Sequence, residues 1–83
     1  MIKIYVTRKD IRLGQRYSHI NCPIARAIKR RTKESYSVHR YFVSRSINDL
    51  TYNLPDEASK FIESFDSKEN VKPFKFDINL PLK

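Results

Sequence analysis

The residues of this chain with the greatest intrinsic reactivity are one cysteine and two histidines. His19 precedes Cys22 by three positions, and His39 stands further along the chain. A thiol at a helix N-terminus beside basic residues can have a lowered pKa, and a histidine can act as its base. The sequence provides no glycine for an oxyanion hole and no acid to orient the base. We therefore favour a small buried capping residue at Cys22, with a nucleophilic thiol as the alternative.

These three residues could also supply three ligands to a metal ion. A zinc site needs a fourth ligand and usually pairs its ligands at short spacing, and the sequence offers neither. The single glycine cannot build a phosphate-binding loop. The acidic pairs at residues 56–57 and at Glu63 and Asp66 fit a helix dipole and a solvated helix face. We therefore expect no enzymatic activity, no metal and no cofactor.

Positive charge is concentrated in the first half of the chain. The 83 residues carry 17 Lys and Arg against nine acids, a formal net charge of +8. Residues 1–47 hold twelve of these cations and two acids, whereas residues 48–83 hold five cations and seven acids. Such a polarised surface favours nucleic acid, an anionic membrane surface or an acidic protein as a partner.

The cationic residues are centred on a helix predicted to begin at Pro23 and to extend to about Lys33. Proline suits the first helical position, which puts Cys22 at the N-cap, with Asn21 as the alternative cap. An apolar stripe on this helix consists of Ile24, Ala27 and Ile28. A second, cationic stripe consists of Arg26, Lys29, Arg30 and Lys33. No acid within the helix offsets it, so it indicates either a solvated face or a surface for a polyanion.

Aromatic side chains among these cations favour nucleic acid as the ligand, because unstacked bases stack on such rings. The predicted binding residues are Arg8, Lys9, Arg12, Arg16, Arg26, Lys29, Arg30 and Lys33. The predicted aromatic platform consists of Tyr5, Tyr17 and Tyr41. Replacement of Arg26 and Arg30 by Glu is expected to weaken binding to all nucleic-acid sequences and to leave the fold intact.

Local patterns predict the elements that must position these residues. Residues 2–6 alternate as a half-buried strand, and Thr7 to Asp10 forms a capping box ahead of a short helix that Gly14 can end. A long strand is predicted over 35–46, with both of its faces partly apolar, so its buried face stays open. After a turn at Asn48-Asp49, a returning strand covers 50–54. A helix begins at Pro55, and a strand covers 74–80.

The element order is therefore β-α-β-β-α-β, with an extra helical turn after the first strand. This order predicts one small α+β domain over residues 1–83, in the ferredoxin-like split βαβ arrangement: an antiparallel sheet with two helices on one face. An open α+β sheet with another strand order is the alternative. The expected core consists of Ile4, Ile28, Phe61, Ile62, Phe65, Phe74, Phe76 and Ile78.

Length and composition set further limits. A domain of this size has a thin core, which is compatible with a homodimer. One cysteine excludes an internal disulfide and indicates a reducing compartment, so we expect a cytoplasmic protein. No signal peptide is expected at the N-terminus, and no apolar run approaches the roughly 20 residues that span a bilayer.

Two segments carry a resemblance to known proteins. The first is the helix start Cys22-Pro23-Ile24-Ala25 with Ala27-Ile28. The second begins at Leu54-Pro55, contains Ala58, Phe61-Ile62 and Phe65-Asp66, and continues into Val71, Pro73-Phe74 and Phe76. Over most of its length the chain resembles small uncharacterised proteins of phages and bacterial genomes. This resemblance implies a viral or mobile-element origin, and hence a location in the host cytoplasm. It assigns no activity to any residue.

These observations predict a non-enzymatic binding protein that uses a basic helix face to bind DNA or RNA. The alternative is a protein that docks on an acidic host protein and inhibits or redirects it, for example in a defence system. A thiol enzyme built on Cys22 is a third, remote alternative. Cys22→Ser is therefore expected to retain function.

Overall fold

The computed structural model describes residues 1–45 and 50–81 and shows a small α+β protein. In this part of the chain there are three helices and two antiparallel sheets, with the element order β-α-α-β-β-β-α-β. The predicted α+β class is confirmed. The ferredoxin-like order is not confirmed, because the strands form two separate sheets instead of one: the first and last strands make a ribbon, and the middle strands make a sheet that does not pair with it.

The first sheet is a two-stranded ribbon of β1 (Ile2–Val6) and β5 (Phe74–Ile78). The strands are antiparallel, with Ile4 opposite Phe76 and Tyr5 opposite Lys75. Alternate residues point to the core, as the period of two in the sequence predicts. The opposite face of β1 is exposed to solvent and carries Lys3 and Tyr5.

The second sheet consists of β2 (Ser37–Val38), β3 (Phe42–Arg45) and β4 (Leu50–Asn53), in that order. The prediction of one long strand over 35–46 is wrong, because the chain turns at residues 39–41 and β3 pairs back onto β2, with Val43 opposite Val38. The turn also explains the ambiguous pattern, since the buried set changes parity across it. The returning strand is confirmed as β4; the predicted turn at Asn48-Asp49 lies outside the described residues.

Helix α1 (Arg8–Leu13) begins with the predicted capping box. The Asp10 N–H donates to Thr7 Oγ1 at 3.2 Å, and the Thr7 N–H donates to Asp10 Oδ2 at 2.9 Å. Gly14 ends the helix in an extended conformation with φ −70°, so left-handed geometry is not the reason for glycine here. A Cβ at this position would lie 2.7 Å from both the Asp10 carbonyl oxygen and Pro23 Cδ. Glycine is required because α1 packs closely on α2.

The two longer helices begin close to where the sequence predicts. Helix α2 (Pro23–Thr32) has Pro23 at its first position and Cys22 at its N-cap, and Lys33 ends it in a left-handed conformation. Helix α3 (Asp56–Asp66) starts one residue later than predicted, since Pro55 is its N-cap rather than its first residue.

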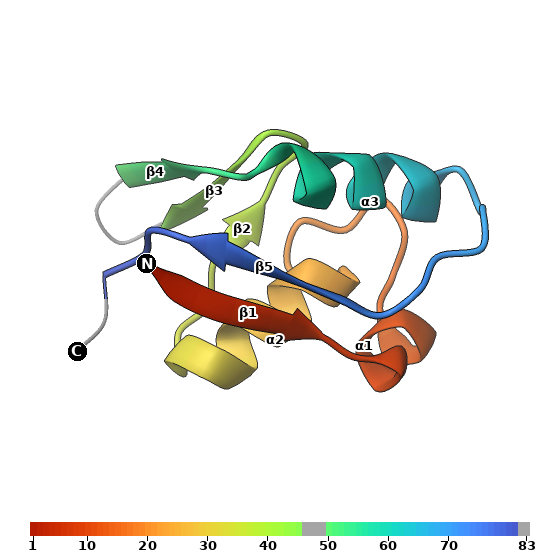
Figure 1. The fold of residues 1–83 in the computed structure, drawn as a ribbon, viewed down its shortest axis with the longest axis horizontal. Helices are drawn as coiled ribbons and strands as arrows, with labels where there is room; N and C mark the ends of the chain where they lie inside the picture. The colour runs from red at the N-terminus through yellow and green to blue at the C-terminus, as the bar shows by residue number, and fades with distance from the viewer. Residues whose placement is uncertain (46–49, 82–83) are drawn as a thin grey trace.

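The core lies between the ribbon, the second sheet and the two longer helices (Figure 1). Helix α2 packs against β1, β2 and α1, and the opposite layer contains α3 and the second sheet. Six of the eight predicted core residues are buried, and Ile62 and Phe74 are partly buried against the same cluster. The fold therefore leaves one side of α2 free, between α1 and the segment that leads into β2.

Candidate functional site

The strongest concentration of positive charge in the described structure surrounds a cleft along α2. We call it the basic cleft; its volume is about 790 Å³. Its lining residues are Lys9, Ile20, Asn21, Ala25, Arg26, Lys29, Arg30, Lys33, Ser35 and Tyr36. Half of these residues are cationic, and none of the described residues that line the cleft is acidic. The cleft thus brings together five of the eight predicted binding residues, including the whole cationic stripe of α2.

A buried carboxylate lies beneath two of these cations. Asp10 has 1% of its side chain exposed and receives a two-point contact from Arg30: Nη1 donates to Oδ1 at 2.7 Å and Nη2 donates to Oδ2 at 2.8 Å. Arg30 Nη2 also donates to the Tyr5 carbonyl oxygen at 2.7 Å. Arg26 Nε lies 3.6 Å from Asp10 Oδ1, an electrostatic contact without a hydrogen bond. Asp10, which lies on α1, therefore orients two arginines of α2.

The charged state of Asp10 is stabilised by these contacts. Burial by itself would raise the pKa of this carboxyl group. The Arg30 hydrogen bond, the backbone hydrogen bond from Thr7 and the positive charge of Arg30 outweigh that cost, so the pKa of Asp10 lies below its ordinary value. The hydrogen bond to Asp10 also raises the pKa of Arg30. The pair is ionised at neutral pH.

This arrangement corrects one sequence-based expectation. The cationic stripe has no acid within α2, but Asp10 supplies one from a neighbouring helix. Glutamates at positions 26 and 30 would place two further carboxylates beside a buried one, which is expected to disrupt the fold. The double replacement therefore cannot test binding alone. Lys29 and Lys33 are exposed, and among the described residues neither has an ion-pair partner.

The other three predicted cations lie away from the basic cleft. Arg16 is used within the protein: its Nε donates to the Phe65 carbonyl oxygen at 3.1 Å, and its guanidinium lies 5.3 Å from the centre of the Phe65 ring. Arg8 lines a different, shallow hollow beside β5. Arg12 is exposed in the last turn of α1. The predicted basic surface is therefore split: five of its residues line the cleft, and the other three lie apart from it.

The predicted aromatic platform is also divided. Tyr5, Tyr17 and Tyr41 are all exposed, but they lie on β1, on the loop before α2 and in the turn between β2 and β3. The tyrosine that lines the cleft is Tyr36, which sequence reasoning left out of the platform. Tyr36 is buried, and its hydroxyl has no hydrogen-bond partner among the described residues.

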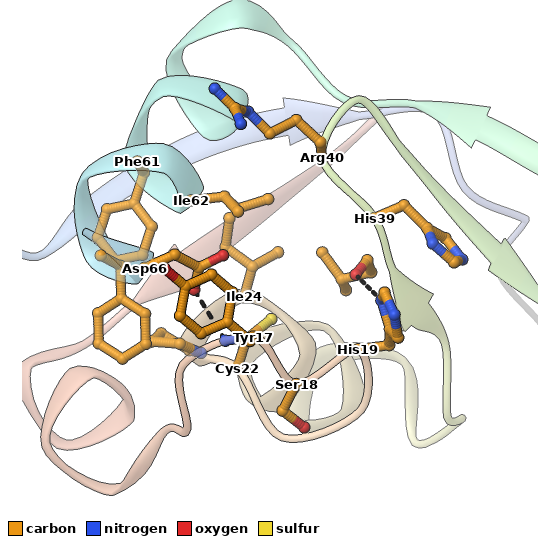
Figure 2. Close-up of a pocket in the computed structure, with 13 residues that line it drawn as sticks. Tyr17, Ser18, His19, Cys22, Ile24, His39, Arg40, Phe61, Ile62 and Asp66 are labelled. Carbon is orange, nitrogen blue, oxygen red and sulfur yellow. Dashed lines mark hydrogen bonds between the residues drawn. The ribbon is translucent and has the colours of Figure 1, made fainter. Parts of the chain in front are cut away.

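Cys22 and the two histidines lie near a second hollow, which we call the apolar pocket (Figure 2). Its volume is about 310 Å³. Its lining residues are Tyr17, Ser18, His19, Cys22, Pro23, Ile24, Val38, His39, Arg40, Phe61, Ile62, Phe65 and Asp66. The rings of His19 and His39 lie 4.7 Å apart, and His39 stacks on Phe42 at 4.5 Å. Residue types alone grouped the two histidines with Cys22, but no local pattern indicated that their rings would lie in contact, because they are 20 positions apart.

The thiol of Cys22 is a helix cap in the structure. Its sulfur accepts a hydrogen bond from the Ala25 N–H at 3.4 Å, and the side chain is buried. Burial raises the pKa of the thiol, and the N–H groups of Ala25 and Ile24 only partly offset this effect. A raised pKa disfavours the thiolate that a nucleophile needs. Among the described residues, no three His, Cys, Asp or Glu side chains are grouped so that they could hold a metal ion.

Substitution of Cys22 should separate the capping role from a chemical one. We expect Cys22→Ser to keep both stability and the predicted binding function, because a serine oxygen accepts the same backbone hydrogen bond. Cys22→Ala should lose about 0.5–2 kcal/mol of unfolding free energy, since the cap acceptor is removed, and should still bind. Thermal unfolding and binding assays on both variants check this. Loss of binding by a folded serine variant would contradict it and revive the thiol hypothesis.

Comparisons with known proteins identify no relative of this chain. No family model, no curated protein and no solved structure matches the chain. Of the helices in residues 1–45 and 50–81, none is long and apolar enough to cross a membrane. The structural class is thus a small basic α+β protein that carries a cationic cleft and an apolar pocket.

Proposed function

We propose that this protein binds nucleic acid through the basic cleft, with the phosphate backbone lying along α2. The observation that carries the proposal is the grouping of five cations around one cleft. Positively charged grooves of this kind follow a phosphate backbone, and neutralisation of phosphates releases counterions and drives binding. The proposed role is binding without chemistry, in the cytoplasm of the host cell.

The two kinds of cation in the cleft are expected to act differently. Arg26 and Arg30 are fixed by Asp10, so they lose little conformational freedom when a phosphate binds. Their side chains are still 34% and 49% exposed, which leaves N–H groups available to a ligand. Lys29, Lys33 and Lys9 carry their charge on the flexible stem that every lysine has, so they can follow the backbone of any sequence. Binding should therefore depend on phosphate and little on base sequence.

Charge reversal at the two unpaired lysines tests the proposal. We expect Lys29→Glu with Lys33→Glu to weaken binding to DNA and RNA by roughly tenfold or more at low salt, and to reduce the slope of log K against log salt by about one unit per lysine. Fluorescence anisotropy with short labelled strands at several salt concentrations measures both. Circular dichroism and thermal unfolding should show that the fold is kept, because neither lysine pairs with a described carboxylate.

The matched control is Lys60→Glu with Lys72→Glu. It makes the same change in net charge at two exposed positions outside the cleft and should have a much smaller effect. An equal loss in both double variants would mean that net charge, not the cleft, governs binding. Weak, salt-insensitive binding by the wild type would reject the proposal and leave docking on an acidic protein as the leading hypothesis.

A further inference from the structure

The apolar pocket and the basic cleft share a wall, and this juxtaposition carries a further inference that rests on the proposed function. The shared wall joins the loop before α2 to the segment leading into β2. The Val38 N–H donates to the His19 carbonyl oxygen at 2.7 Å, and His19 Nδ1 donates to the Val38 carbonyl oxygen at 3.2 Å. Ile20 and Asn21 face the cleft, whereas the neighbouring Ser18 and His19 face the pocket.

We propose that the ligand is single-stranded and that one of its unstacked bases enters the apolar pocket while its backbone lies in the basic cleft. Consecutive residues, His19 and Ile20, line the two hollows, so a strand that leaves the cleft over this loop is directed toward the pocket. Duplex bases are stacked and paired, so a duplex could use the cleft but not the pocket.

The composition of the pocket favours a base over a phosphate. Its inner wall is apolar and includes Ile24, Phe61 and Ile62, against which an unpaired phosphate would be poorly solvated (Figure 2). Asp66 also lies in the wall and would repel a phosphate. A base offers flat apolar faces to such a wall and polar edges to the histidine rings at the other side. A volume of about 310 Å³ exceeds that of a single base.

The loop that presents Tyr17 to the pocket is held in an uncommon conformation. Tyr17 has a φ of 59°, a left-handed value that is unfavourable for a residue of this size. Two contacts to the end of α3 stabilise it: the Tyr17 N–H donates to Asp66 Oδ1 at 3.0 Å, and Arg16 Nε donates to the Phe65 carbonyl oxygen at 3.1 Å. These contacts leave Tyr17 77% exposed, with its ring beside the pocket. We assign this ring the role of stacking on the base.

The test compares strands that differ only in their bases. Wild-type protein is titrated with a DNA strand of about 12 nucleotides, with a strand of the same length in which all internal sites are abasic, and with the duplex. All three probes offer phosphates to the cleft, and only the first offers unstacked bases along its length. We expect the intact strand to bind about fivefold or more tightly than the abasic strand, which is the lower range for stacking of one base.

Two protein variants complete the experiment. Tyr17→Asn removes the ring and keeps both the backbone N–H and a residue that tolerates left-handed geometry. It should abolish the preference for the intact strand. Tyr41→Asn should retain it, because the structure places this residue of the predicted platform outside both hollows. Equal, salt-dependent binding of intact and abasic strands by the wild type would overturn this inference and leave the proposed function standing. If none of the probes is bound in a salt-dependent way, the proposed function is rejected, and this inference with it.

Discussion

Asp10→Asn is expected to destabilise the protein by about 1.5–3 kcal/mol at neutral pH, since the charge-assisted hydrogen bonds from Arg30 and the electrostatic contact with Arg26 are lost, while both arginines stay partly exposed to water. The variant keeps the size of the side chain and an acceptor for the Thr7 N–H. It loses the negative charge that faces Arg30 and Arg26. Chemical denaturation at pH 7 measures the difference. Because total stabilities are commonly about 5–15 kcal/mol, a substantial fraction of the variant is expected to be unfolded in mild denaturant.

The effect of this substitution should depend on pH in a defined direction. The pKa of Asp10 is lower in the folded protein than in the unfolded chain, so ionised Asp10 contributes its stability above the ordinary aspartate pKa and loses it as the pH falls through the lower folded value. The protonated carboxyl group of Asp10 and the amide that replaces it in the variant are both neutral and similar in shape. We therefore expect the difference in unfolding free energy between wild type and variant to shrink below about pH 4.

The control for Asp10 is Asp77→Asn. Asp77 forms an exposed ion pair with Lys3 at 3.9 Å, and its side chain is 54% exposed. Such surface pairs contribute about 0–1 kcal/mol. If Asp10→Asn loses no more unfolding free energy than Asp77→Asn, the contacts of Asp10 with the arginines of α2 do not stabilise the fold.

The second large effect is expected from Phe76→Ala, which should cost about 3–5 kcal/mol of unfolding free energy. Phe76 is 2% exposed, lies opposite Ile4 in the ribbon, and has its ring 5.5 Å from that of Phe74. Truncation leaves a cavity at the centre of a thin core that cannot easily close. Thermal and denaturant unfolding measure the loss.

Lys75→Ala, on the exposed face of the same strand, is the matched control and should change stability by no more than about 0.5 kcal/mol. If Phe76→Ala does not fold well enough for measurement, Phe76→Leu keeps part of the volume and should give a smaller but clear loss. An unchanged unfolding midpoint in Phe76→Ala would mean that the face of β5 that carries Phe76 does not pack in the core.

The features that the sequence determined by itself are those set by neighbouring residues. The capping box of Thr7 and Asp10 and the proline start of α2 depend on hydrogen bonds and φ angles within three or four positions, so their residue types alone predicted them. Strands β1 and β5 each have one clearly apolar face, so alternation with a period of two allows only one choice of the buried face. Residues 35–46 have apolar groups on both faces, and their pattern could not reveal the turn at 39–41.

Only the tertiary structure decided how distant residues meet. Asp10 and Arg30 are 20 positions apart, and their pairing exists because Gly14 lets α1 pack closely on α2. The same packing placed Lys9 beside the cations of α2 and left Arg8 and Arg12 outside the cleft. The hydrogen bonds between His19 and Val38 set the cleft beside the apolar pocket. Residue types predicted a basic surface, but its shape depends on contacts between helices and loops that no local pattern encodes.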